Sequence, residues 1–299
     1  MNRQSKLSES YDTIMALKGA EDFKKKIRRQ QSFLVNKEAC DQDMGISFPS
    51  ELWIVRRGGG VTTLLGAYAQ YLHAARAMEF CGLDKFLEFN LDYVAPNATF
   101  SELARLDRSI SVKTGHNRYY KGIICININS WAHYTEDEHF TKFINYIAFN
   151  KDKWLTIFIV YAPRGDAVES IETALARRIS FETHDIRFPE SDEMLELVEG
   201  WLVSNSIRLT KGAKIMLHET IGELAKGKHF HGFRTIRQLT ESIIYTVLTY
   251  HMENRHRITA QMLSQYSKDS DYVKMSKAQI NTRKPIGFSV DGGGFQHEL

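Results

Sequence analysis

The residues with the clearest chemical meaning form a short glycine-rich segment that ends in two threonines. The segment reads Gly58, Gly59, Gly60, Val61, Thr62 and Thr63. In a phosphate-binding loop of the form G-x-x-x-x-G-K-[ST], backbone N–H groups hold the phosphates, the lysine neutralises them and the hydroxyl binds magnesium. Gly60 stands at the second glycine and Thr62 at the hydroxyl, but Val61 stands at the lysine. The pattern therefore predicts a phosphate loop that has kept its turn and lost its charge.

The elements that would position this loop flank it directly. Residues 52–55 are a short apolar run, which predicts a buried strand, and residues 62–79 are rich in Leu, Ala and Tyr, which predicts a helix. Strand, glycine turn and helix form the unit that cradles phosphate in α/β nucleotide-binding proteins. A glycine turn between a strand and a helix also occurs without phosphate, so the turn alone leaves both interpretations open.

Two further apolar runs, residues 122–126 and 154–160, predict buried strands, and residues 184–188 predict a fourth, shorter one. Continuous apolar runs separated by helical stretches favour an α/β fold with a mostly parallel sheet covered on both faces. After Pro189 the pattern becomes helical. We predict an α/β core over residues 1–188, including an N-terminal helical segment, and a small helical module with a tail over residues 189–299.

Composition excludes several other classes of protein. No apolar run is long enough to span a bilayer and the first residues are polar, so we predict a cytoplasmic protein without a membrane segment. The three cysteines lack metal-type spacing, and no metal site is predicted from them. The net charge of +3 is too mild to indicate nucleic acid. The basic stretch at residues 24–29 is read as the solvated face of a helix, with nucleic-acid binding kept as an alternative.

Several degenerate motifs follow one another along the chain. They are residues 17–24 (LKGAEDFK), the glycine turn, residues 122–131 (GIICININSW), residues 174–181 (ALARRISF) and residues 232–238 (GFRTIRQ). In this order they resemble one branch of the AAA+ ATPases, that of the sporulation stage V protein K and red-type Rubisco activase. The resemblance implies an AAA+ P-loop core followed by a helical lid.

The resemblance also shows what is missing from the second catalytic element, the Walker B motif. The family strand ends in Asp-Glu, where the aspartate steadies magnesium and the glutamate activates water. Here Asn127 and Ile128 occupy these positions. Asparagine is a poorer magnesium partner than a carboxylate, and isoleucine cannot orient or deprotonate water.

Other residue roles are implied by the resemblance alone. It places Leu17 and Gly19 on the adenine side of the nucleotide and Arg234 at the lid position that reaches the γ-phosphate. It makes Arg177 or Arg178 the arginine that completes the site of a neighbouring subunit. Each of these arginines is equally well explained as an ordinary surface charge.

These losses predict a pseudo-ATPase that serves as an assembly or regulatory subunit, with no catalytic residues of its own. It would bind ATP or ADP with Mg²⁺ weakly or not at all, and hydrolyse ATP negligibly. The expected partners are other AAA+ subunits, in a homo-oligomer or in a mixed ring with an intact paralogue; a protein client is not identified. One alternative is an active NTPase in which Arg56 or Arg57 replaces the lysine. The other is a nucleic-acid-associated AAA+ scaffold.

Overall fold

The computed structural model of the chain describes residues 3–39, 49–56, 58–75, 86–90, 105, 108, 122–129, 131, 134–151, 154–161, 166–227, 230–250 and 256–269. The chain divides into two compact units, which are Met1–Met194 with His231–Thr235, and Leu195–Phe230 with Ile236–Leu299. The domain boundary at residues 188 and 189 stays a prediction. None of the helices among the described residues is both long and apolar enough to cross a membrane.

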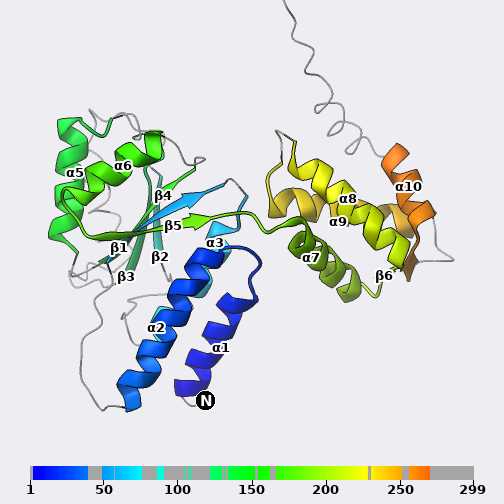
Figure 1. Cartoon of the computed structure of the whole chain (residues 1–299), viewed down its shortest axis with the longest axis horizontal. Coiled ribbons are helices and arrows are strands. Elements are labelled where there is room, and N and C mark those ends of the chain that lie inside the picture. Colours follow the sequence, from blue (N-terminus) through cyan, green and yellow to red (C-terminus); the bar gives the residue numbers. More distant parts are fainter. Residues whose placement is uncertain are drawn as a thin grey trace, which may run out of the picture. The chain divides into compact units, whose positions relative to one another are not determined.

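The first unit is built on a five-stranded sheet with the order β2-β3-β4-β1-β5 (Figure 1). Its strands are β1 (Ser50–Val55), β2 (Phe86–Asn90), β3 (Gly122–Asn127), β4 (Trp154–Val160) and β5 (Phe181–Ile186). Every neighbouring pair is parallel, which confirms the predicted α/β fold class. The central strands β1, β3 and β4 are the ones that the apolar runs predicted, because a strand covered on both faces has no polar side.

The two edge strands depart from the prediction. Strand β2 was not predicted, and β5 begins at Phe181 and ends at Ile186 rather than covering residues 184–188. Both alternate between more buried and more exposed residues along their length. An edge strand has a neighbour on one side only, so it does not need the continuous apolar run by which the central strands are recognised.

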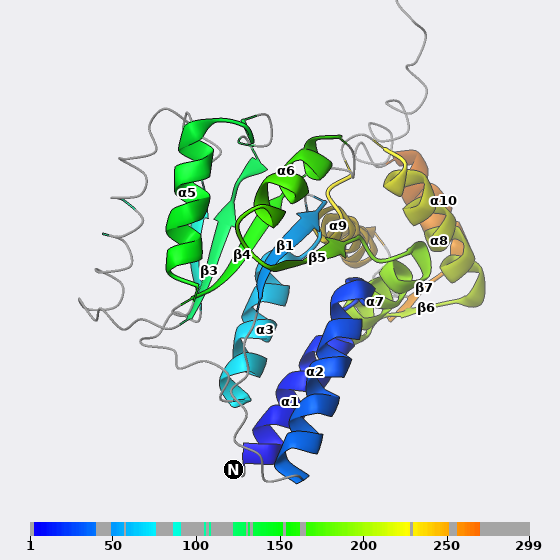
Figure 2. The same ribbon diagram turned by 60° about the vertical axis from the view of Figure 1, so that its left-hand side comes forward.

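Helices cover both faces of the sheet. They are α1 (Arg3–Ala16), α2 (Glu21–Ala39), α3 (Val61–Ala74), α5 (Glu138–Phe149) and α6 (Asp166–Ala176). Since successive side chains of a strand point to opposite faces, β1 contributes Trp53 and Val55 to one hydrophobic core, and Leu52 and Ile54 to the other. The first core includes residues of α1, α2 and α3, and the second includes residues of α5 and α6 (Figure 2).

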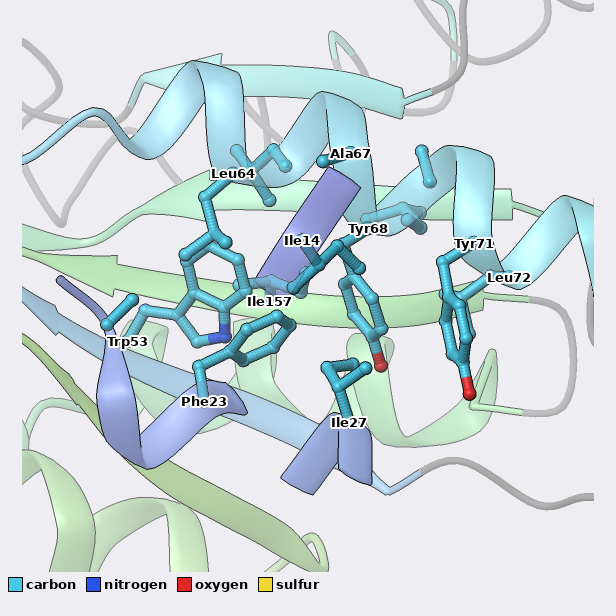
Figure 3. Close-up of a cluster of buried hydrophobic side chains, with 14 of the residues drawn as sticks. Ile14, Phe23, Ile27, Trp53, Leu64, Ala67, Tyr68, Tyr71, Leu72 and Ile157 are labelled. Atoms are coloured by element: carbon cyan, nitrogen blue, oxygen red, sulfur yellow. The ribbon is translucent and has the colours of Figure 1, made fainter. Parts of the chain in front are cut away.

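Aromatic side chains dominate the first core. The ring of Phe23, from α2, lies edge-on to Trp53 of β1 and to Tyr68 of α3, with centroid distances of 5.0 and 4.9 Å (Figure 3). The N-terminal helical segment that the sequence predicts consists of two helices, α1 and α2. The chain turns between them at Gly19 and Ala20, whose φ angles are 76° and 57°.

The second unit is mostly helical. The helices beyond β5 are α7 (Ser191–Ser204), α8 (Lys211–Ala225), α9 (Phe233–Tyr250) and α10 (Ala260–Asp269). A short parallel pair, β6 (Arg208–Leu209) with β7 (Arg257–Ile258), joins the connections before α8 and α10. Thr210 caps α8 by accepting a hydrogen bond from the N–H of Ala213 at 3.3 Å. The helical pattern predicted after Pro189 is confirmed for α7, α8 and α9, whereas α10 was not predicted.

Candidate phosphate site

The glycine turn connects the central strand β1 to helix α3. β1 ends at Val55 and α3 begins at Val61, as the strand-turn-helix pattern predicts. Gly58 and Gly60 have φ angles of 87° and 73°, a left-handed conformation that glycine adopts without steric cost. The N–H of Gly59 donates to the carbonyl of Arg56 at 2.9 Å and closes the turn.

The start of α3 retains part of what an anion site needs. The first N–H groups of a helix have no acceptor within the helix, and Gly60, at the N-cap, has no side chain to accept from them. Thr62 and Thr63 are exposed there. These backbone donors and the helix dipole would favour a phosphate. The turn therefore fits an anion in its backbone but supplies no cationic side chain from within the helix start.

Val61, at the lysine position of the motif, is only 8% exposed and belongs to the hydrophobic core that α3 shares with α1 and α2. Its side chain packs with apolar neighbours. At the position where the predicted loop would carry a lysine, the chain therefore has a residue that stabilises the packing of α3.

The segment at the start of α9 lies against the turn, within the same unit. The N–H of Phe233 donates to the carbonyl of Gly58 at 3.2 Å. Arg234, the predicted lid arginine, follows directly and is exposed. Its placement in the chain matches the resemblance, and a role toward phosphate stays a prediction.

The end of β3 lies at the same edge of the sheet, because the carboxyl ends of parallel strands share an edge. The side-chain carbonyl of Asn127 accepts from the N–H of Asn129 at 3.0 Å, and its amide donates to Asn90 of β2 at 3.1 Å. Asn129 accepts in turn from the N–H of Tyr161 at 3.0 Å. These asparagines tie together the ends of β2, β3 and β4, a structural use of the position that the motif gives to magnesium.

Ile128 is fully buried in the second core, and its N–H donates to the carbonyl of Ile159 at 3.1 Å. A residue so placed can neither activate water nor touch a metal. Among the described residues, no group of three or more His, Cys, Asp or Glu side chains could hold a metal ion. Asn127, bonded to Asn90 and Asn129, and the buried Ile128 offer no carboxylate to magnesium.

The predicted interface arginines lie after α6. Arg177 is exposed and forms an ion pair with Glu136 of the same chain at 3.2 Å, and Arg178 is exposed as well. Arg56 is also exposed, while Arg57 lies outside the described residues. The structure leaves the roles of these arginines as predictions.

The N-terminal segment that resembles the adenine side contacts the connection between β5 and α7. The N–H of Gly19 lies 3.4 Å from a carboxylate oxygen of Glu193. A Cβ on Gly19 would lie 3.0 Å from the carbonyl of Arg187, so the backbones approach closely there. Leu17 is half-buried next to this contact. That either residue faces adenine stays a prediction.

The fold of this chain is similar to that of several solved structures, although its sequence is not. No protein-family model matches the sequence, and no curated protein matches it. C. elegans PCH-2 aligns with a TM-score of 0.53 and 13% identity, over 90% of this chain and 73% of that chain. Two Thermotoga maritima RuvB structures, a proline-to-glycine mutant and the Holliday junction branch migration motor, align with TM-scores of 0.49 and 0.48. Their identities are 11% and 10%, over 86% and 85% of this chain and 72% of each of theirs.

The chain has an AAA+ fold. The parallel five-stranded sheet with helices on both faces is the shared architecture, and PCH-2 carries this assignment. At such low identity the likeness concerns the fold alone. The resemblance to one particular AAA+ branch stays a prediction.

A buried charged group near the amino ends of the strands was missed by the sequence analysis. Glu51 of β1 is fully buried, and its carboxylate accepts from Lys26 at 2.7 Å, from the Tyr68 hydroxyl at 2.9 Å and from the Trp53 indole at 2.8 Å. Burial and the nearby carboxylate raise the pKa of Tyr68 well above its usual value of 10. The signal available in the sequence was a glutamate inside an otherwise apolar strand.

His184 and Glu182 of β5 complete this group, which we call the Glu51 cluster. Glu182 lies 3.1 Å from the Lys26 ammonium, and His184 Nε2 is 3.6 Å from Glu51 and 3.7 Å from Glu182. Burial lowers the pKa of His184 below its usual value of 6.5, against the attraction of the two carboxylates. The cluster ties α2 and α3 to β1 and β5.

The basic stretch at residues 24–29 is largely engaged within the chain. Lys24 is buried and pairs with Glu21 at 2.7 Å, and Lys25 pairs with an aspartate one turn earlier at 3.0 Å. The third lysine, Lys26, is part of the Glu51 cluster. Nucleic-acid binding needs basic side chains that are free to contact phosphates along one surface. Lys24, Lys25 and Lys26 are instead paired with carboxylates of the same chain, which weighs against the nucleic-acid alternative.

Proposed function

We propose that this chain is a degenerate AAA+ protein, a pseudo-ATPase that acts as an assembly or regulatory subunit and hydrolyses ATP weakly or not at all. One observation carries the proposal. Val61 and Ile128, at two of the three positions where the motifs carry a catalytic charge, are both packed into hydrophobic cores. Residues used for packing in this way cannot take part in phosphoryl transfer.

Phosphoryl transfer depends almost entirely on positioning and on neutralising the charge of the transferred group. The loss of a single preorganised charged contributor commonly lowers a rate by about a hundredfold or more. Here the lysine, the magnesium carboxylate and the water-activating carboxylate are all replaced. The proposal therefore includes no catalytic residue, and the replacement of the lysine by an exposed arginine is not favoured.

Nucleotide binding is proposed as weak, with ATP or ADP as the ligand class. The N-terminus of α3 supports it through its first backbone N–H groups, which have no acceptor within the helix. The asparagine bonds at Asn127 oppose a contribution from Mg²⁺, since this amide is engaged by Asn90 and Asn129. We therefore expect any affinity to be nearly independent of magnesium.

The partners proposed are other AAA+ subunits in the cytoplasm, in a homo-oligomer or in a mixed ring with an intact paralogue. The exposed Arg177 and Arg178 support this assignment, because an arginine that serves a neighbour must reach the surface. Sedimentation of the chain alone and with a candidate active subunit tests it, and loss of the mixed species in Arg177→Ala or Arg178→Ala would identify the interface.

Hydrolysis is tested by measuring phosphate release from ATP by the purified chain. The expected result is no release above that of a buffer control, with or without Mg²⁺. Magnesium-dependent turnover that Thr62→Ala abolishes would overturn the proposal, because the start of α3 would then be catalytic. Turnover that collapses in Arg57→Ala would point to the active NTPase instead.

Binding is tested separately with a fluorescent ATP analogue, titrated with and without Mg²⁺. We expect weak binding with equal dissociation constants in the two titrations. A dissociation constant that tightens strongly with Mg²⁺ would contradict the structural use of Asn127. No binding at all would leave the chain a scaffold without a nucleotide.

A further inference from the structure

We propose that the glycine turn is a docking socket for the segment His231–Phe233 of the same chain. We call this contact the glycine latch. It goes beyond the proposed function, because it gives the retained glycines a role that needs no nucleotide. Both sides of the latch belong to the first compact unit.

The latch is a close contact between two backbones. A Cβ on Gly58 would lie 1.9 Å from the carbonyl oxygen of His231, and a Cβ on Gly232 would lie 2.6 Å from the carbonyl oxygen of Gly58. Both glycines have positive φ, of 87° and 54°. Any other residue would be strained and would collide with backbone, so glycine is required at both positions by the chain itself.

Hydrogen bonds and aromatic rings hold the segment in place. The N–H of Phe233 donates to the carbonyl of Gly58 at 3.2 Å. The Phe233 ring covers Gly60, where a Cβ would lie 3.0 Å from it, and the ring of Phe188 packs against Gly232. The N–H of His231 is anchored to the hydroxyl of the buried Thr235 at 2.9 Å.

This arrangement competes with phosphate. In a phosphate-binding loop the glycine backbone is left open so that its N–H groups can converge on an anion. Here a carbonyl oxygen lies against Gly58, an aromatic ring lies against Gly60, and the N–H of Gly59 is taken by Arg56. A phosphate that took the place of the Phe233 ring beside Gly60 would have to displace it, and the Gly59 N–H would have to leave Arg56.

Amide hydrogen exchange of the full-length chain without nucleotide tests the latch. Phe233 is the first residue of α9, so its N–H has no acceptor within that helix, and its protection reports the bond to Gly58. We expect the Phe233 amide to be protected in the wild type. Exchange as fast as that of an unprotected amide would overturn the latch.

Three variants sharpen the test. Gly58→Ala should lower the protection of the Phe233 amide about tenfold or more, while the amides of β1, β3 and β4 stay protected. The control variant Gly66→Ala lies within α3, and its added Cβ has nothing within 4 Å. It should leave the protection of the Phe233 amide unchanged. If Gly58→Ala fails to fold, Phe233→Ala serves instead, because it keeps the N–H and removes only the ring over Gly60. Unchanged protection in the folded variant would overturn the latch.

The same samples separate this inference from the proposed function. Magnesium-dependent ATP turnover would overturn the pseudo-ATPase while a protected Phe233 amide would still support the latch. An unprotected amide in a chain that releases no phosphate would overturn the latch and leave the pseudo-ATPase standing.

Discussion

The two ends of the parallel sheet differ in the way they use polar residues. At the carboxyl end, where the candidate phosphate site lies, the chain has Val61 and Ile128 in hydrophobic cores and asparagines bonded to one another. Toward the amino end, where no motif is found, it has the Glu51 cluster, with a carboxylate and an ammonium ion both buried. Among the described residues, the Glu51 cluster uses buried charge to hold helices to the sheet, whereas the candidate phosphate site has apolar and amide side chains at Val61, Ile128 and Asn127.

The contrast shows that a charge that stabilises the fold and a charge that acts on a ligand need different surroundings. A buried charge is tolerated only when it is paired and hydrogen-bonded, and Glu51 meets this condition with Lys26, Trp53 and Tyr68. A catalytic charge must instead stay open toward a ligand, at a cost in stability. At Asn127 and Ile128 the carboxyl end carries no such open carboxylate, which is consistent with the proposed function.

The largest effect is expected from removing the charge at the centre of the Glu51 cluster. Glu51→Gln leaves Lys26 buried with only Glu182 as a counter-charge, so the free energy of unfolding should fall by about 3 kcal/mol. Urea denaturation measures it. The matched control is Glu241→Gln in the exposed pair with Arg237, which should change stability by less than about 1 kcal/mol. Equal effects in the two variants would show that burial gives the Glu51–Lys26 pair no larger role in stability than an exposed pair has.

A smaller effect is expected at the carboxyl end. Asn127→Asp restores the family's carboxylate but removes the amide that donates to Asn90, so stability should fall by about 1 kcal/mol without a gain from Mg²⁺. The reciprocal change Asn90→Asp keeps an acceptor for Asn127 and should cost less. Thermal unfolding with and without Mg²⁺ measures both. A magnesium-dependent rise in Tm for Asn127→Asp would show that the catalytic position is still open.

Acid should weaken the Glu51 cluster through His184. The lowered pKa keeps His184 neutral in the folded protein to a lower pH than in the unfolded chain, where the value is near 6.5. Unfolding therefore takes up a proton below that pH, and the free energy of unfolding should fall as the pH drops through it. Urea denaturation at several pH values measures the slope. His184→Gln should flatten it, whereas His73→Gln, at an exposed position, serves as control; an unchanged slope in His184→Gln would contradict the assignment.

The smallest change in stability is expected from replacing Gly66, the glycine within α3, and its direction should be opposite to that of replacing Gly58 in the turn. Gly66→Ala should raise the free energy of unfolding by about 0.5–1 kcal/mol, because it lies within α3 with free space around it. Gly58→Ala should act in the opposite direction because of the clash with His231. Thermal unfolding of both variants measures the difference. Stabilisation by Gly58→Ala would mean that the turn is not closed by its own chain.

A large part of the fold follows from local patterns. The runs at residues 52–55, 122–126 and 154–160 predict the central strands, since a strand buried on both faces must be apolar throughout. The glycines before Val61 predict the turn into α3. The edge strand β2 escaped prediction, because its residues alternate and its pairing with β3 is a contact across the chain.

The candidate site was predicted only in part. The glycine turn before Val61 follows from residue type and spacing, whereas the catalytic positions assigned to Val61, Asn127 and Ile128 rest on the motif resemblance and stay predictions. That Val61 and Ile128 are core residues, and that Asn127 bonds to Asn90, depends on which elements pack together. No local pattern contains that information.

The sequence by itself determined the parallel α/β fold and the glycine turn, because residue type and short-range spacing suffice for each. Only the tertiary structure decided which residues these elements bring together. Glu51 finds Lys26, Tyr68 and His184 through packing of separate elements, and Gly58 meets His231 across more than half of the chain. Contacts between residues far apart in sequence carry no local periodicity, so they arise only when the chain has folded.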